Sequence, residues 1–262
     1  MNITTLLDKV YFAPRLKKID FYANRAGELQ HRVLDRLVRM AENTEWGKKY
    51  DYKSIHTYED FRNRLPIQTY EEVKPYVERL RAGEQNLLWP SEIRWFAKSS
   101  GTTNDKSKFL PVSKEALNDT HYQGGKDAVA LYLGQNPDSR FFSGQGLILG
   151  GSHSPNLNSR HGLVGDLSAI LIQNIHPLVN CVRVPSKKIA LMSDFEKKIE
   201  AIANSAISKD VTSLSGVPSW MLVLIKRILE KTGKQSLEEI WPNLEVFFHG
   251  GVAFTPYREQ YK

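Results

Sequence analysis

The chain lacks the features that mark membrane-spanning, disulfide-bonded and strongly basic nucleic-acid-binding proteins. Cys181 is the single cysteine among 262 residues, so no intrachain disulfide can form. No apolar run approaches the roughly 20 residues that cross a bilayer, and the N-terminal stretch lacks the order of a secretory signal. The net charge of +7 is spread along the chain without a basic block, which favours a solvated surface over nucleic-acid binding. We therefore expect a cytoplasmic protein that has neither a membrane nor a nucleic acid as its partner.

Several catalytic signatures are also missing. The sequence contains neither the Gly-x-x-x-x-Gly-Lys-Ser/Thr pattern of a P-loop nor a Ser-His-Asp signature. His153 and His161 lie in or beside a polar stretch without metal-ligand spacing. From the sequence we therefore assign no metal ligand and no catalytic residue.

The segment from Ser99 to Lys108 is the strongest candidate for a ligand-binding loop. It is rich in hydroxyls and separates two short apolar runs that we expect to form strands, with Phe109 at the start of the second. Backbone N–H groups in such a turn can converge on an anion, and Gly101 lets the backbone approach without a Cβ. Hydroxyl donors and a mobile lysine charge suit a phosphate. The predicted phosphate ligands are Ser99, Ser100, Gly101, Thr102, Thr103 and Lys108. The alternative is a solvated Ser/Thr hairpin loop without a ligand.

A second candidate follows the apolar segment 244–248, which we expect to be a strand. The sequence His249-Gly250-Gly251-Val252-Ala253 places two glycines at the carboxyl end of that strand. In open α/β sheets, ligands bind in the crevice beyond the carboxyl ends of the strands. Backbone without side chains can lie flat there against a planar ring. The alternative is an ordinary turn from strand to loop.

A third segment lies between these two. Pro218 is well placed at the first position of a helix. The apolar residues of this helix form a broad stripe that comprises Met221, Leu222, Ile225, Ile228 and Leu229. Apolar residues at helical spacing usually pack into a core. Core packing is therefore the alternative to any ligand contact made by the start of this helix.

The chain as a whole alternates expected strands and helices, with 41% hydrophobic and 25% charged residues as in ordinary globular proteins. We predict an α/β fold of layered sheets flanked by helices, in which residues 1–92 are mainly helical and residues 93–262 form the α/β part. Gly124 and Gly125 are expected to interrupt a helix that begins behind Ser113. Ser193 and Glu196 are expected to form a capping box that opens a later helix.

The run from Ser99 to Lys108, followed by Phe109-Leu110-Pro111, resembles the phosphate loop of adenylate-forming enzymes. Within that superfamily it is most similar to bacterial relatives of the plant auxin-responsive Gretchen Hagen family, the acyl acid amido synthetases. The Gly-Gly segment follows in the family's order, at a comparable distance along the chain. One departure is Asn104-Asp105, where many members carry glycine. Because Asn and Asp tolerate the left-handed conformation, the turn is still feasible.

The resemblance implies the fold of the large N-terminal domain of firefly luciferase-like adenylate-forming enzymes. It implies that Gly250, Gly251, Val252 and Ala253 contact the adenine of ATP, and that Val217, Pro218 and Met221 contact the acyl acid. The implied reaction is ATP-dependent activation of a carboxylic acid as an acyl-adenylate, followed by transfer to an amine such as an amino acid. The first step needs no general base, because a carboxylate is already a nucleophile at neutral pH.

Family members are considerably longer, and the motifs that complete their ATP site follow the Gly-Gly segment. We therefore expect residues 1–262 to form an incomplete N-terminal adenylate-forming domain that is inactive alone, with its Mg²⁺ ligand in the missing C-terminal part. Two alternatives stay open. One is an enzyme of the same superfamily that transfers the acyl group to coenzyme A or a protein thiol. The other is a non-catalytic nucleotide-binding or interaction module.

Overall fold

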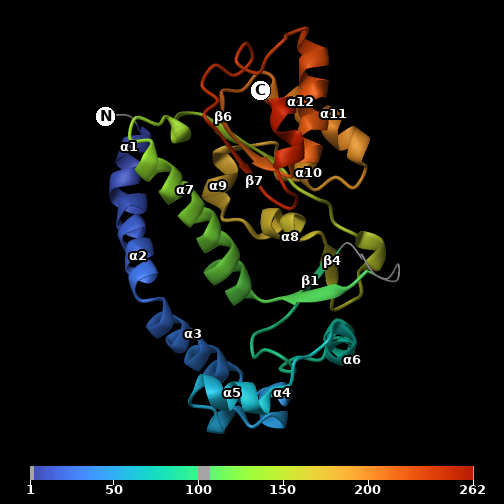
Figure 1. Cartoon of the computed structure of the whole chain (residues 1–262). Helices are drawn as coiled ribbons and strands as arrows, with labels where there is room; N and C mark the ends of the chain where they lie inside the picture. The colour runs from blue at the N-terminus through green and yellow to red at the C-terminus, as the bar shows by residue number, and fades with distance from the viewer. Residues whose placement is uncertain (1–2, 100–106, 262) are drawn as a thin grey trace. The chain divides into compact units, whose positions relative to one another are not determined.

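A computed structural model describes residues 3–99 and 107–261 (Figure 1). The chain consists of two compact units. Unit 1 comprises residues 1–13, 131–153 and 166–262, and unit 2 comprises residues 14–130 and 154–165. Each unit has a sheet and a hydrophobic core of its own. The mixed α/β class with helices around the sheets confirms the predicted fold class.

The N-terminal part of unit 2 is helical. Its elements are α2 (Ala13–Asn24), α3 (Ala26–Ala41), α4 (Glu45–Lys49), a 3₁₀ turn (Tyr52–Ser54), α5 (Tyr58–Arg64) and α6 (Tyr70–Ala82). Local capping chemistry sets two of the helix starts, because the backbone N–H of Thr57 donates to Asp60 (2.9 Å) and that of Thr69 donates to Glu72 (2.6 Å). Helix α6 ends at Gly83, whose φ of 108° lies in the left-handed region.

The sheet of unit 2 has the order β2-β1-β4. Strand β1 (Trp95–Lys98) pairs antiparallel with β2 (Phe109–Val112) and parallel with β4 (Leu163–Gly165). The two strands predicted on either side of the candidate loop are therefore confirmed. Pro111 lies in the edge strand β2. A proline is tolerated in an edge strand because one side of the strand has no neighbouring strand to accept an N–H hydrogen bond. The core under this sheet consists of Val77, Leu80, Leu87, Ile93, Phe96 and Val164. A 3₁₀ turn (Pro155–Leu157) precedes β4.

The predicted interruption at Gly124 and Gly125 is wrong. A π-helical stretch (Ala116–Tyr122) runs directly into α7 (Gln123–Gln135), and both glycines lie in the first turn of α7. A glycine costs a helix only about 1 kcal/mol relative to alanine. Tertiary contacts offset that cost, because Arg15 forms a two-pronged ion pair with Asp127 at 2.5 and 2.8 Å, one turn beyond the glycines.

Unit 1 is built around a four-stranded parallel sheet in the order β5-β3-β6-β7. The strands are β3 (Gln145–Leu149), β5 (Arg183–Val184), β6 (Val211–Gly216) and β7 (Val246–His249). Leu149 pairs with Gly216, and Gly216 pairs with His249, so three strands end at the same level. Their carboxyl ends therefore form one common edge.

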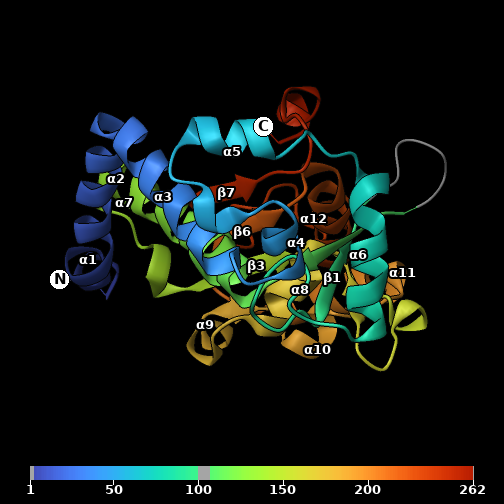
Figure 2. The ribbon, with the colours of Figure 1, turned by 90° about the horizontal axis from the view of Figure 1, so that it is seen from below.

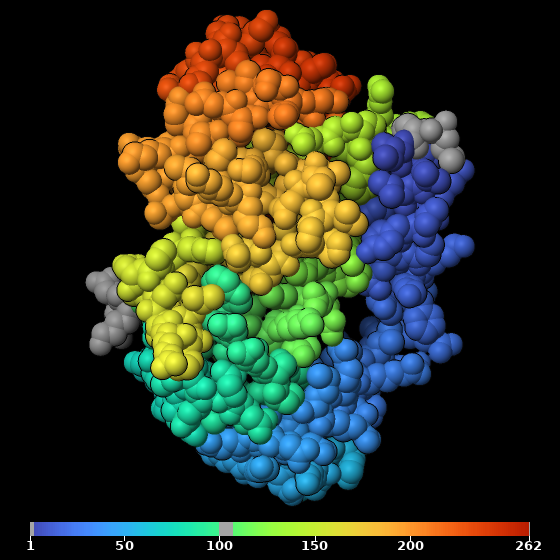
Figure 3. All heavy atoms as spheres, turned by 180° about the vertical axis from the view of Figure 1, so that it is seen from behind, coloured from blue at the N-terminus to red at the C-terminus, as the bar shows by residue number. Residues whose placement is uncertain are grey.

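The helical elements of unit 1 surround this sheet. They are α1 (Ile3–Leu7), a π-helical stretch (Asp8–Phe12), a 3₁₀ turn (Phe141–Ser143), α8 (Leu167–Asn174), α9 (Pro177–Cys181), α10 (Lys187–Ala190), α11 (Phe195–Ala206), α12 (Pro218–Thr232) and a final 3₁₀ segment (Thr255–Tyr261). Buried side chains of α11 and α12 share one core with β3 and β6, and Figure 2 shows β6, β7 and α12 as neighbours. Residues of α8 to α11 form a continuous surface, gold to orange in Figure 3.

The starts of the two long C-terminal helices differ in how well the sequence predicts them. Pro218 begins α12 as predicted. Helix α11 is capped by Asp194 and not by Ser193, because the Asp194 carboxylate accepts from the backbone N–H of Lys197 at 3.1 Å. Aspartate competes well with serine for this position, and the capping box predicted for Ser193 does not form.

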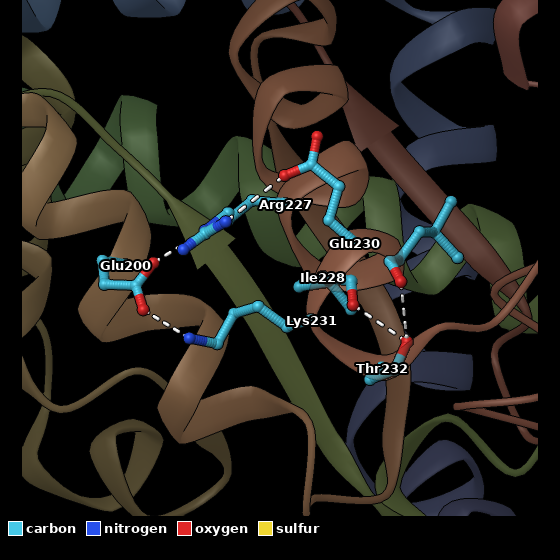
Figure 4. Close-up of polar contacts among 7 residues, drawn as sticks. Glu200, Arg227, Ile228, Glu230, Lys231 and Thr232 are labelled. Carbon is cyan, nitrogen blue, oxygen red and sulfur yellow. Dashed lines mark hydrogen bonds and ion pairs between the residues drawn. The ribbon is translucent and has the colours of Figure 1, made fainter.

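An ion-pair cluster ties α11 to α12 (Figure 4). Glu200 of α11 accepts from Lys231 and, at 2.7 Å, from Arg227, both on α12. These two bonds, that of Lys231 first, lower the pKa of Glu200 to about 2. A surface groove of 820 Å³ runs along both helices, and its lining includes Phe195, Glu200, Val223 and Arg227.

Candidate functional site

Two glycine-rich turns and the start of α12 lie at the carboxyl edge of the sheet in unit 1. Gly150 and Gly151 follow β3, Val217 follows β6, and Gly250 and Gly251 follow β7. From β3 the chain passes to β5 on one side of the sheet, whereas β6 and β7 lie on the other side. The strand order therefore reverses between β3 and β6. In open α/β sheets this switch point is where ligands bind.

The structure brings two of the predicted segments together at this edge. Gly251 has a φ of 84°, and a Cβ built on it would lie 3.3 Å from Cγ2 of Val217. The backbone after β7 therefore approaches the start of α12 closely, in a conformation that favours glycine. Gly250, Val252 and Ala253 are exposed beside it. Their contact with adenine stays a prediction.

The three predicted acid-binding residues differ in accessibility. Val217 is half-buried, whereas Pro218 is buried and Met221 is 0% exposed within the core of unit 1. A Cβ on Gly216 would lie 2.8 Å from the Leu149 carbonyl oxygen and 3.3 Å from Cε of Met221, so this strand end also needs glycine. Val217 is therefore the member of this set with surface to offer a ligand.

An aromatic cluster supports the turn after β7. The His249 and Phe254 rings stack with their centroids 4.4 Å apart, and Tyr261 lies 5.4 Å from Phe254. The Tyr261 hydroxyl donates to the Pro218 carbonyl at 2.7 Å. Burial raises the pKa of Tyr261 well above its usual value, so the hydroxyl keeps its proton. The segment that follows Gly251 is thus tied back to the first turn of α12.

The predicted phosphate loop belongs to unit 2. Ser99 and Lys108 are at its two ends, and the Ser99 N–H donates to the Lys108 carbonyl at 3.0 Å. Ser100, Gly101, Thr102 and Thr103 lie outside the described residues. The Lys108 ammonium is 5.4 Å from the centroid of the Tyr70 ring, and its residue is exposed. Because the Phe109 N–H donates to the Tyr70 hydroxyl at 2.9 Å, the base of the loop is held in place. An anion can therefore reach the lysine.

Comparison with known proteins decides the family. A profile described as "GH3 family N-terminal domain" matches residues 15–262. The chain belongs to the GH3 family. It is 30% identical over 103 residues to the indole-3-acetic acid-amido synthetase GH3.2 of Arabidopsis thaliana, which covers 39% of this chain and 19% of that protein. It is 26% identical over 106 residues to the jasmonoyl-L-amino acid synthetase JAR4 of Nicotiana attenuata, with coverage of 40% and 18%. The predicted family is confirmed.

Solved GH3 structures share the fold. The GH3.15 acyl acid amido synthetase matches with a TM-score of 0.69 and 16% identity over 94% of this chain and 53% of that chain. The AtGH3.15 acyl acid amido synthetase in complex with 2,4-DB matches with a TM-score of 0.72 and 17% identity, covering 89% and 50%. This chain therefore spans about half the length of those GH3 proteins.

One part of the carboxyl edge was missed by sequence reasoning. The turn Gly150-Gly151-Ser152 after β3 repeats the pattern of two glycines after a strand, which was available as a signal. The ammonium of Lys198 in α11 donates to the carbonyls of Gly150 (2.9 Å) and Gly151 (2.7 Å). Lys198 is four residues before the buried Ile202, so its helical position is on the apolar face.

The groove along α11 and α12 is lined by none of the predicted site residues. Within residues 3–99 and 107–261, no group of three or more His, Cys, Asp or Glu side chains is arranged to hold a metal ion. In the same ranges no helix has the length and apolarity to cross a bilayer.

Proposed function

We propose that this chain carries the acid- and nucleotide-binding parts of an ATP-dependent ligase. The ligase activates a carboxylic acid as an acyl-adenylate and transfers the acyl group to an amine, for which an amino acid is the favoured acceptor. The observation that carries the proposal is the contact between the turn after β7 and Val217 at the common carboxyl edge. Membership of the GH3 family and the names of the amido synthetase relatives support it.

In this proposal each segment has one role. Gly250, Gly251, Val252 and Ala253 lie against adenine, while Val217, Pro218 and Met221 form the acid pocket. The phosphate ligands are Ser99, Ser100, Gly101, Thr102, Thr103 and Lys108. The acid has an aromatic or aliphatic body, since the side chains of the pocket are apolar. Indole-3-acetic acid and 2,4-DB, which occur in the names of similar proteins, are therefore suitable first probes.

The chemistry has two steps. A carboxylate oxygen attacks the α-phosphorus of ATP, and the bond from that phosphorus to the pyrophosphate oxygen breaks. The amine nitrogen then attacks the acyl carbon, AMP leaves with the oxygen that linked them, and the nitrogen loses a proton. The loop donors and Lys108 contribute preorganised positive potential at the phosphates. Mg²⁺ is the expected counter-ion of ATP, and the described residues give it no ligand set. We assign it no step.

Equilibrium titration with labelled ATP tests the loop. Lys108→Ala and Thr102→Ala should each weaken ATP binding by about 1.5 to 3 kcal/mol, the value of a charge-assisted hydrogen bond. Lys114→Ala is the matched control, because Lys114 is also exposed and follows β2. Equal ATP affinity in all four proteins, with folding intact, would exclude the loop from the site.

A ligand panel separates the alternatives. Thermal shifts with ATP and indole-3-acetate, 2,4-DB and a series of aryl and alkyl carboxylates identify the acid. Amino acids and coenzyme A, added as acceptors, distinguish amide synthesis from thioester synthesis. Tight and steeply salt-dependent binding to an oligonucleotide, with little preference for ATP, would instead support an interaction module.

A further inference from the structure

We propose that Lys198 is a positioning residue, which fixes the backbone turn after β3 and so sets the wall of the acid pocket beside Val217. The inference rests on the proposed function, since it needs an acid bound at the switch point. It adds a residue for which neither the family resemblance nor the loop motifs provide a role.

The ammonium of Lys198 donates hydrogen bonds to the turn after β3. The residue is 1% exposed, and a buried charge is costly unless it is hydrogen-bonded. Its three N–H donors reach the carbonyls of Gly150 and Gly151 and, at 3.3 Å, the hydroxyl of Ser152. All three acceptors belong to consecutive residues. Lys198 thereby holds the turn against α11.

Helix α8 holds the same turn through other atoms. The Gly151 N–H donates to the Ser168 hydroxyl at 2.7 Å, and the Ser152 N–H donates to an Asp166 carboxylate oxygen at 2.8 Å. The Asp166 N–H donates in return to the Ser152 carbonyl at 3.0 Å. Five polar groups of the Gly150-Gly151-Ser152 backbone are thus fixed by two helices.

Close packing against Asp166 and Ile172 restricts the position of this turn. A Cβ on Gly151 would clash with the Asp166 carboxylate, and a Cβ on Gly150 would lie 2.8 Å from Cδ1 of Ile172. Gly151 is therefore required by the approach of Asp166, whereas a side chain at position 150 would displace the end of Ile172. Without Lys198, the buried carbonyls of Gly150 and Gly151 and the hydroxyl of Ser152 lose its hydrogen bonds. Because unsatisfied buried carbonyls are costly, we expect the turn to shift.

The turn after β3 lies closer to the predicted acid pocket than to the predicted adenine segment in the strand order. Leu149 and Gly216 are paired, so Gly150 and Val217 are each one residue beyond the last pair and begin the crevice between β3 and β6. The Gly250-Gly251 turn follows β7, which is one strand further from β3. A displaced turn after β3 therefore alters the acid pocket while the predicted adenine segment stays in place.

The test compares Lys198→Met and the milder Ser168→Ala with Lys197→Met as the matched control. Lys197 is the adjacent residue, and its side chain is 77% exposed. Two quantities are measured: hydrogen exchange at the Gly151 and Ser152 amides, and the dissociation constants for ATP and for each acid of the panel. We expect Lys198→Met to speed exchange at both amides at least tenfold and to weaken acid binding about tenfold or more, as lost hydrogen bonds to a buried charge imply. ATP affinity should stay within about threefold, Ser168→Ala should show a smaller effect of the same kind, and Lys197→Met should match the wild type.

Four results would overturn the proposal. Unchanged exchange at both amides would show that Lys198 does not hold the turn. Faster exchange with unchanged acid affinity, or equal losses for acid and ATP, would show a structural role only. If Lys198→Met does not fold, Ser168→Ala is judged by the same criteria. If no acid of the panel binds the wild type although the Lys198→Met exchange result is as expected, the proposed function fails and this inference fails with it.

Discussion

The buried ammonium of Lys198 gives a prediction about stability at alkaline pH. Burial lowers the pKa of Lys198 from 10.5 to about 8, and the charge of Asp166 partly opposes that shift. Below pH 8 the lysine is protonated in both folded and unfolded chains. Between pH 8 and 10.5 the folded protein releases this proton while the unfolded chain retains it. Because the unfolded state then binds more protons, the free energy of unfolding rises with pH over this window.

The size of the effect follows from the two pKa values. Each pKa unit corresponds to about 1.4 kcal/mol, so the contribution of Lys198 increases by about 2 kcal/mol between pH 7 and pH 9.5. Asp166 and His153 are the titratable groups that face the ammonium. Burial first, and then the Lys198 charge, lower the pKa of His153, so it is neutral across this range.

The assay is urea unfolding of the wild type and Lys198→Met at pH 7, 8, 9 and 9.5, followed by far-UV circular dichroism. Methionine does not titrate, and all other groups are common to both proteins, so their difference isolates Lys198. We expect the wild type to gain about 2 kcal/mol relative to Lys198→Met between pH 7 and 9.5. A difference that stays constant within about 0.5 kcal/mol would refute the reasoning, because it would mean that burial leaves the Lys198 pKa at its ordinary value.

Three further predictions concern the carboxyl edge. Gly251→Ala should weaken ATP binding and lower stability by about 1–2 kcal/mol through its positive φ. Gly250→Ala, with open space around its Cβ, should leave the free energy of unfolding unchanged. ATP titration and urea unfolding measure these effects. Tyr261→Phe should lower the free energy of unfolding by about 1 kcal/mol through loss of the bond to Pro218, and an unchanged urea midpoint would contradict this. Met221→Ala should cost about 2–5 kcal/mol as a core truncation. An altered ranking of acids in the thermal-shift panel would add a pocket role for Met221, and an unaltered ranking would leave it as core.

Features set by neighbours in the sequence were predictable. Pro218 starts α12 because its ring fits the first helical turn. The strands on either side of the Ser99–Lys108 loop follow from their aromatic and β-branched residues. In each case the deciding interactions span only a few residues, so the local pattern contains the information.

Other features depended on contacts between distant residues. Gly124 and Gly125 stay helical where Arg15 and Asp127 pair across 112 positions. Likewise, the helical position of Lys198 lies on the apolar face of α11, but its hydrogen bonds go to acceptors 47 and 48 residues away. The sequence by itself determined the family and the segments that carry the candidate site. Only the tertiary structure decided that the turn after β7 meets Val217 and that Lys198 bonds the turn after β3. The reason is that strand order and helix packing are set by burial between distant segments, which no short segment encodes.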